Sequence, residues 1–241
     1  MDNRREFLHR ALQLSVLSAV LSPATLALVG QRAQAQMLGQ IPANMPPGRS
    51  VYELRGDVFV DQQRATDTTL ITADSHVRTG SNSYIIFVVG RDAYILRENS
   101  ELQLRSEGVV ATGLRLVTGK LLSVFGQRND EALSLSTSTA TIGIRGTGVY
   151  AESYDDRSYL CTCYGRTLVS ANAAPSQAEM IEADYHDARY VLANPEQGRY
   201  IIPGPYINHT DEELVLLEAL VGRVPPFNQM RQDYQGPRRR Y

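Results

Sequence analysis

Residues 138–166 read STATIGIRGTGVYAESYDDRSYLCTCYGR and carry the clearest structural signal in the chain. Apolar and polar residues alternate here in two runs, Val149–Tyr154 and Ser158–Tyr164. An alternation with a period of two is typical of β-strands that bury one face. Asp155, Asp156 and Arg157 separate the two runs and favour a turn, so this segment predicts a β-hairpin.

The centre of the segment, Ile142–Gly148, contains three glycines within six residues. Glycines at this density in a strand indicate a bulge or a close approach between backbones. Arg145, Gly146 and Thr147 also fit a second interpretation, in which backbone N–H groups and the guanidinium bind an anion. Glycine clusters in strands more often serve packing, and we expect that structural role here.

From Val51 onward the chain consists of short alternating runs separated by turn residues. No helical period of useful length occurs before Arg166, so we predict an all-β fold, either a β-sandwich or a short solenoid-like stack. Tyr84–Val89 is apolar on both faces and should be a central strand. The other expected strands are Val51–Val60, His76–Arg78, Ala93–Leu96, Leu102–Arg105, Leu114–Val117, Leu121–Phe125, Leu133–Ser136, Leu168–Ser170, Glu179–Glu182, Tyr190–Leu192 and Tyr200–Ile202.

One α-helix is expected near the C-terminus, over residues 211–221. Thr210 is a good N-cap residue, and Glu213 completes a capping box with it. Leucines and valines recur at helical spacing after Glu213, and Gly222 favours a stop. We expect the apolar side of this helix to pack on the β core.

Short motifs between Val51 and Val169 resemble those of the FecR domain, a family named after the periplasmic regulator of iron-dicitrate uptake. Ile142–Tyr150 resembles the closing motif of that domain. The resemblance implies an all-β domain that acts as a non-enzymatic binding or sensory module in the cell envelope, with another envelope protein as its partner. The remaining motifs follow in the family's order as Gly56-Asp57-Val58, Val77-Arg78-Thr79-Gly80-Ser81, Glu98-Asn99-Ser100-Glu101-Leu102 and Leu116-Val117-Thr118-Gly119-Lys120-Leu121.

These observations divide the chain into five parts. We expect a signal peptide at 1–35, a linker at 36–50 and a FecR-like β domain at 51–170. A C-terminal extension that contains the helix follows at 171–228, and a disordered basic tail at 229–241.

The N-terminus has the three regions of an export signal in order. Asn3–Leu8 matches a twin-arginine pattern, Leu12–Val29 is moderately apolar, and Ala33–Ala35 offers the small residues that signal peptidase requires. We expect cleavage after Ala35 and a periplasmic location. The alternative is a retained membrane anchor, but the polar residues of the apolar run and Pro23 make it a poor spanning helix.

Composition and missing motifs exclude several functions. The formal net charge of −2 gives no basic footprint for nucleic acid. The sequence has no nucleophile elbow, phosphate-binding glycine loop, H-E-x-x-H motif or dinucleotide fingerprint. We therefore expect a non-enzymatic protein that does not bind nucleic acid and contacts the membrane only if the leader is retained.

The most chemically distinctive residues are the two cysteines, Cys161 and Cys163. Because they are two positions apart on an expected strand, their side chains share one face. Together with His186 and His209 they could form a Cys₂His₂ set, which suits zinc or copper. This set is the candidate metal site of the sequence.

Two other interpretations of the cysteines remain open. An oxidising periplasm favours a disulfide, although Cα atoms two positions apart on a strand lie about 6.5–7 Å from each other, which would strain the bridge. The thiols could also serve packing alone, with His186 on the surface and His209 assisting the helix cap. If the metal interpretation holds, Asp187 or Asp211 would orient a ligating imidazole.

Overall fold

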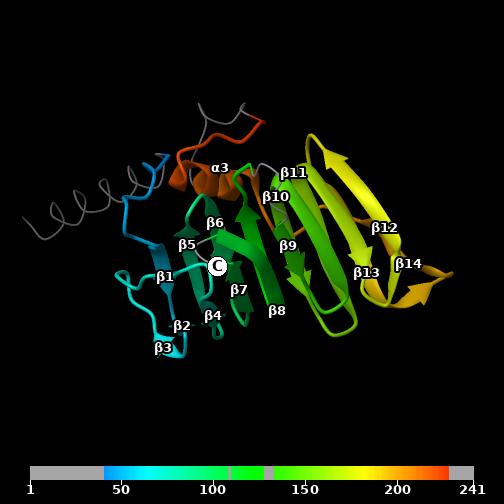
Figure 1. Cartoon of the computed structure of the whole chain (residues 1–241), viewed down its shortest axis with the longest axis horizontal. Coiled ribbons are helices and arrows are strands. Elements are labelled where there is room, and N and C mark those ends of the chain that lie inside the picture. Colours follow the sequence, from blue (N-terminus) through cyan, green and yellow to red (C-terminus); the bar gives the residue numbers. More distant parts are fainter. Residues whose placement is uncertain (1–40, 108–109, 128–132, 228–241) are drawn as a thin grey trace, which may run out of the picture. The chain divides into compact units, whose positions relative to one another are not determined.

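The computed structural model describes residues 41–107, 110–127 and 133–227. The expected signal peptide, the first part of the linker and the basic tail lie outside the described residues. The described part forms a 14-stranded sheet and one helix, α3, so the prediction of an all-β fold with a C-terminal helix is confirmed (Figure 1). The strands are β1 (Val51–Arg55), β2 (Val58–Val60), β3 (Gln63–Arg64), β4 (His76–Thr79), β5 (Tyr84–Val89), β6 (Asp92–Leu96), β7 (Glu101–Glu107), β8 (Val110–Val124), β9 (Leu133–Ser136), β10 (Ala140–Ser153), β11 (Arg157–Ala171), β12 (Ala174–Ala183), β13 (Asp187–Glu196) and β14 (Arg199–Gly204).

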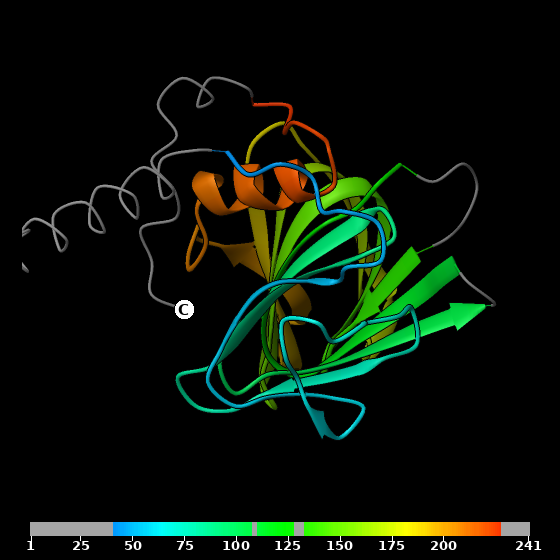
Figure 2. The same ribbon diagram turned by 90° about the vertical axis from the view of Figure 1, so that its left-hand side faces the viewer.

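Three long strands, β8, β10 and β11, shape the sheet because each changes partner along its length. The first part of β8 pairs with β7 and its end pairs with β6. The start of β10 pairs with β9 and its second half with β8, while β11 pairs first with β13 and then with β12. The sheet therefore bends into two layers that share these strands, an open sandwich (Figure 2).

A glycine with positive φ lies at the bend of each long strand. These are Gly119 in β8 (φ +90°), Gly146 in β10 (φ +56°) and Gly165 in β11 (φ +86°). A Cβ on Gly165 would lie 2.8 Å from the carbonyl oxygen of Gly146, which is closer than real Cβ contacts come. Gly146 of the central motif thus serves the bend. The two strands expected on either side of Gly119 are one strand, β8, because the glycine lets the strand bend without ending.

The main core fills the space between the two layers. Strand β5 is packed on both faces, because its alternate residues belong to two different clusters. Ile85 and Phe87 belong to this main core, whereas Ile86 and Val88 belong to a second cluster on the opposite face. The prediction that β5 is a central strand is confirmed, because it is buried on both faces and lies between β1 and β6.

The second cluster lies under helix α3, which spans Asp211–Leu220 and contacts β6 and β8. The predicted capping box is present, since the Thr210 hydroxyl accepts from the Glu213 backbone N–H and the Glu213 carboxylate accepts from the Thr210 N–H. The helix ends one residue earlier than expected, with Val221 as its C-cap. None of the helices in the described part is long and apolar enough to cross a membrane.

The sequence after residue 171 continues the same sheet. Strands β12 and β13 both pair with β11, and β14 pairs with β13. These strands are longer than the runs expected from the sequence. The expected strand Val51–Val60 is instead two strands, β1 and β2, interrupted at Gly56, whose φ is +78°.

Candidate metal centre

The first half of β11 presents Cys161 and Cys163 to the second cluster, beneath helix α3. Both side chains are fully buried, and both thiols are free. The intervening Thr162 points to the other face, as the pleat requires. The expectation that the two sulfurs share one face is therefore met in the structure.

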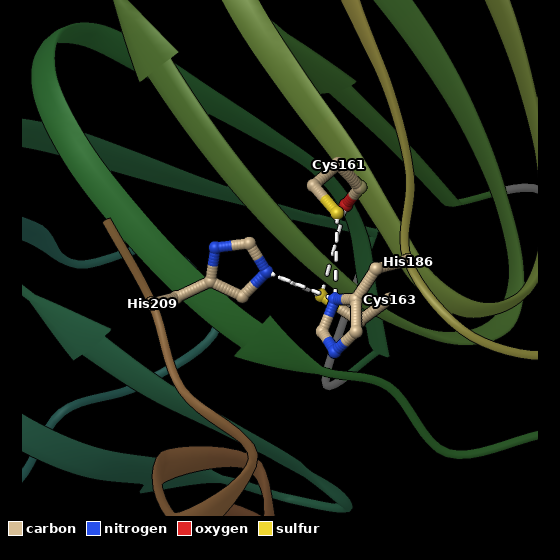
Figure 3. A group of neighbouring side chains, drawn as sticks. All are labelled: Cys161, Cys163, His186 and His209. Carbon is tan, nitrogen blue, oxygen red and sulfur yellow. Dashed lines mark hydrogen bonds between the residues drawn. The ribbon is translucent and has the colours of Figure 1, made fainter. Parts of the chain in front are cut away.

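His186 and His209 reach the cysteines from two different segments (Figure 3). His186 lies in the turn between β12 and β13 with φ +39°, and its backbone N–H donates to the Cys163 carbonyl at 3.0 Å. His209 directly precedes the Thr210 N-cap of α3 and is 1% exposed. One ligand atom from each of the four side chains lies within 4.8 Å of the others.

Three of the six separations between the ligand atoms match the edges of a tetrahedron around one metal ion, and all six lie within 4.8 Å. The Cys161 Sγ is 3.6 Å from His186 Nδ1, and the Cys163 Sγ is 3.4 Å from His209 Nε2. The two imidazole nitrogens are 3.2 Å apart. Tetrahedral zinc, with its usual bond lengths to sulfur and nitrogen, gives edges of about 3.6 Å for S···N and about 3.3 Å for N···N. The four residues fit a single ion.

The partners of the outer imidazole nitrogens fix which nitrogen faces the sulfurs. His209 Nδ1 lies 2.7 Å from the Ile207 carbonyl, which can only accept, so Nδ1 carries the proton and Nε2 has the free lone pair. His186 Nε2 donates to Asp211 Oδ1 at 2.8 Å, which leaves Nδ1 for a metal. The other Asp211 oxygen accepts from the Tyr185 hydroxyl at 2.7 Å. Such outer partners are typical of ligating histidines.

Of the two aspartates expected to orient an imidazole, only Asp211 does so. Asp187 instead forms an ion pair with Arg189. The fold explains the difference, since Asp211 opens helix α3 beside the site, whereas Asp187 starts β13.

Aromatic rings surround the two histidines. Tyr150 stacks on His209 with ring centroids 4.6 Å apart, and Tyr206 contacts both imidazoles, at 4.3 Å from His186 and 4.7 Å from His209. Tyr185 packs on His186 at 4.4 Å. None of these rings was predicted from the sequence to lie at the site. Only Tyr185, the chain neighbour of His186, has a sequence position that could have suggested its role.

Without a metal, the two cysteines and His186 have different pKa values and so differ in protonation at neutral pH. The hydrogen bond from the Cys163 thiol, together with those from His186 and His209, outweighs burial and lowers the pKa of Cys161 to about 4. Burial raises the pKa of Cys163 well above its usual value. Burial opposes ionisation of His186, but its bonds to Asp211 and Cys161 raise its pKa to about 9. The metal-free site therefore holds a thiolate beside an imidazolium, in a position that a cation can take over.

The stability of the metal-free protein should fall on either side of a plateau between pH 6.5 and 9. Cys161, whose pKa is about 4 when folded, contributes stability that is lost as the pH falls, and His186, with a pKa of about 9, contributes stability that is lost as the pH rises. Between pH 6.5 and 9 the two contributions change in opposite directions and offset each other. Above pH 9 the raised pKa of Cys163 lowers stability.

Urea unfolding in a chelator at a series of pH values measures this profile, and Cys161→Ala should remove most of the loss below pH 6.5. A wild-type profile that stays flat from pH 4 to pH 7 would contradict the assigned thiolate.

The Arg145-Gly146-Thr147 motif lies outside this set of four residues. Thr147 is fully buried, and its carbonyl accepts from the Phe125 N–H at 3.0 Å. Arg145 is exposed and, with Gly146, lines a separate pocket. The structure thus brings together the four metal candidates but not the glycine motif.

No family model matches the chain, and no curated protein matches it. Two crystal structures from Parabacteroides distasonis, each described as a "putative anti-sigma factor", are similar to it with a TM-score of 0.45 and 11% identity. Each match covers 54% of this chain and 58% of the other chain, so it spans little more than half of either protein. A likeness at this level assigns neither family nor function, and the FecR resemblance stays a prediction from the sequence.

Proposed function

We propose that this chain is a metal-binding protein of the periplasm that holds one transition-metal ion in a buried Cys₂His₂ site. The observation that carries the proposal is the convergence of Cys161, Cys163, His186 and His209, with ligand atoms within 4.8 Å of one another. The separations of those atoms fit a tetrahedral ion, and each imidazole has the outer partner that a ligand requires.

Zinc is the metal that this donor set favours, with copper as the alternative. Two thiolates and two imidazoles in tetrahedral geometry are typical of structural zinc. Four protein ligands fill the coordination sphere and leave no open position for a substrate. The ion would therefore join three segments: strand β11, the turn before β13 and the start of helix α3.

The geometry supports a metal more directly than a disulfide. A bridge between Cys161 and Cys163 would not require an imidazole nitrogen beside each sulfur, yet one nitrogen lies 3.6 Å from Cys161 and another 3.4 Å from Cys163. A packing role for the thiols leaves the position of these two nitrogens and the Asp211 partner unexplained.

Elemental analysis combined with thiol titration tests the proposal on protein purified from its native host. We expect one zinc or copper ion per chain, and thiols that react only after a chelator and denaturant are added. A metal-free protein with two reactive or bridged thiols would contradict it.

Export is the second part of the proposal and rests on the N-terminal sequence. The Asn3–Leu8 pattern is typical of twin-arginine signals, whose route carries folded proteins. A protein that binds its metal while folding in the cytoplasm would suit such a route.

Replacing both Arg4 and Arg5 with lysine is expected to hold most of the protein in the cytoplasm, because the export receptor reads the arginine pair. Cell fractionation with immunodetection measures the distribution. Arg10→Lys, a change of the same kind outside the pair, is the matched control and should leave export intact. Equal periplasmic fractions for the pair variant and the control would contradict a twin-arginine signal.

We also propose that the exported domain contacts another envelope protein. Leu168 and Met180 support this, since they are paired across β11 and β12 and are 44% and 57% exposed. Site-specific crosslinking from position 180 in intact cells tests the contact, and the absence of any product specific to that position would count against it.

A further inference from the structure

The proposed metal site is closed to solvent. Cys161 and Cys163 are 0% exposed, and the side chains of His186 and His209 are almost equally buried. A metal ion could enter or leave only if a neighbouring group moved. The surroundings of the site therefore determine how fast the ion exchanges.

A pocket of about 810 Å³ lies close to the site but contains none of the four ligands in its lining. Tyr164, the chain neighbour of Cys163, forms part of its wall. Asp184, two residues before His186, lies at the same pocket. The pocket is therefore lined by the two segments that supply three of the four ligands: β11, which carries the cysteines, and the turn that carries His186.

Phe227 borders both this pocket and the site. Its ring lines the pocket and lies 5.7 Å from the Tyr164 ring and 6.3 Å from the His186 ring, between centroids. Phe227 is only partly buried and belongs to no helix or strand, so its ring can move at little cost in hydrogen bonds. Tyr185, by contrast, is held by its hydrogen bond to Asp211.

The acidic residues that line the pocket differ in whether an arginine pairs with them. Arg223 neutralises Glu218 at 2.6 Å, and Arg166 pairs with Glu182 at 3.3 Å. Asp184 is exposed and pairs with no cation among the described residues. It is the acidic group of the pocket nearest in sequence to a proposed ligand.

The lining of the same pocket also contains Arg145, on strand β10, in addition to the paired Arg166 and Arg223. Arg145 is opposite Arg166 across the β10–β11 pair, whereas Asp184 lies beyond the end of β12. An incoming cation would therefore be drawn to the Asp184 side, which is the side of the His186 turn.

We propose that this pocket is the route by which a divalent metal ion reaches and leaves the Cys₂His₂ site, and that the Phe227 ring controls the rate of exchange. The inference rests on the proposed metal-binding function. Tyr206 offers the competing route, because its half-exposed ring covers both histidines from outside the pocket.

Transfer of zinc from the loaded full-length protein to the chromogenic chelator 4-(2-pyridylazo)resorcinol, followed by stopped flow, tests the route. We expect Phe227→Ala to release zinc about tenfold faster, which corresponds to a barrier lowered by about 1.4 kcal/mol, with one zinc still bound per chain. Val224→Ala, which alters an exposed residue of the pocket lining that is not among the aromatic contacts of His186, is the control and should match wild type. An unchanged rate in Phe227→Ala, or an equal acceleration in Tyr206→Ala, would overturn the proposal.

Uptake of zinc by the metal-free protein gives a second measurement if Phe227→Ala does not fold. Asp184→Asn is expected to slow uptake by about threefold at low salt, with the difference disappearing at high salt because screening removes the attraction. Equal uptake by wild type and this variant at low salt would also overturn the proposal. A wild-type protein that binds no zinc would contradict the proposed function itself, which is a separate result.

Discussion

Cys163→Ala is expected to abolish stoichiometric metal binding and to lower the stability of the protein measured in zinc. The variant keeps three ligands but loses a fully buried sulfur that no neighbouring group can replace. A protein in zinc at a thousandfold excess over its dissociation constant is stabilised by about 4 kcal/mol. For a chain of this size the loss corresponds to a fall in melting temperature of about 10 °C.

The measurement separates the metal from packing by comparing two conditions. In a chelator, Cys163→Ala should be less stable than wild type by only about 1–2 kcal/mol, the cost of a small cavity and of the lost hydrogen bond to the Cys161 thiolate. His76→Ala is the matched control, since His76 pairs with Glu101 at 2.9 Å on β4 and β7 and is not part of the site. A Cys163→Ala protein that retains one metal ion, or that is equally destabilised with and without zinc, would contradict the proposed site.

Glu213→Ala is expected to cost about 3–5 kcal/mol, because it removes one partner of a buried ion pair. Glu213 is fully buried and accepts from Arg97 at 2.9 Å, while the Arg97 side chain is 9% exposed. The same carboxylate closes the capping box with Thr210. The guanidinium of Arg97 also lies over the Tyr150 ring, which stacks on His209. The substitution should therefore loosen both the start of α3 and the proposed site.

Urea unfolding gives the loss, and Glu212→Ala is the matched control. Glu212 is in the same first turn of α3 but is only partly buried, so its removal should cost no more than about 1 kcal/mol through the helix dipole. Replacing both partners, as in Arg97→Met with Glu213→Leu, should recover most of the stability. Similar losses for Glu212→Ala and Glu213→Ala would show that the ion pair does not carry the effect.

Local signals in the sequence predicted much of this structure. The alternation on either side of Asp155 predicted the β10–β11 hairpin, and Thr210 with Glu213 predicted the start of α3 to the residue. Both depend on residues close in sequence, where period and capping chemistry are sufficient.

The bends and the partners of the long strands could not be predicted in the same way. A glycine such as Gly119 is equally consistent with the end of a strand and with a bend inside one. Only pairing with distant strands distinguishes the two, and β8 pairs with four different strands.

The candidate site was predicted by chemistry rather than by spacing. His186 and His209 are 25 and 46 residues from the cysteines they approach, so no local motif connects them. Residue type alone, in a chain with two cysteines, was enough to name the set. The sequence named Asp211 and Asp187 as candidates to orient an imidazole but could not decide between them. That choice, and the contributions of Tyr206 and Phe227, depend on how α3 and its flanking segments pack, which the sequence pattern does not specify.

The long strands that pass through both layers determine how the described β region unfolds. Because β8, β10 and β11 are each hydrogen-bonded in the two layers, neither layer can lose its strands while the other remains intact. The described β region should therefore melt as one cooperative unit rather than as two independent subdomains. Native-state hydrogen exchange would then give the same opening free energy for the slowest amides on both sides of Gly119, Gly146 and Gly165.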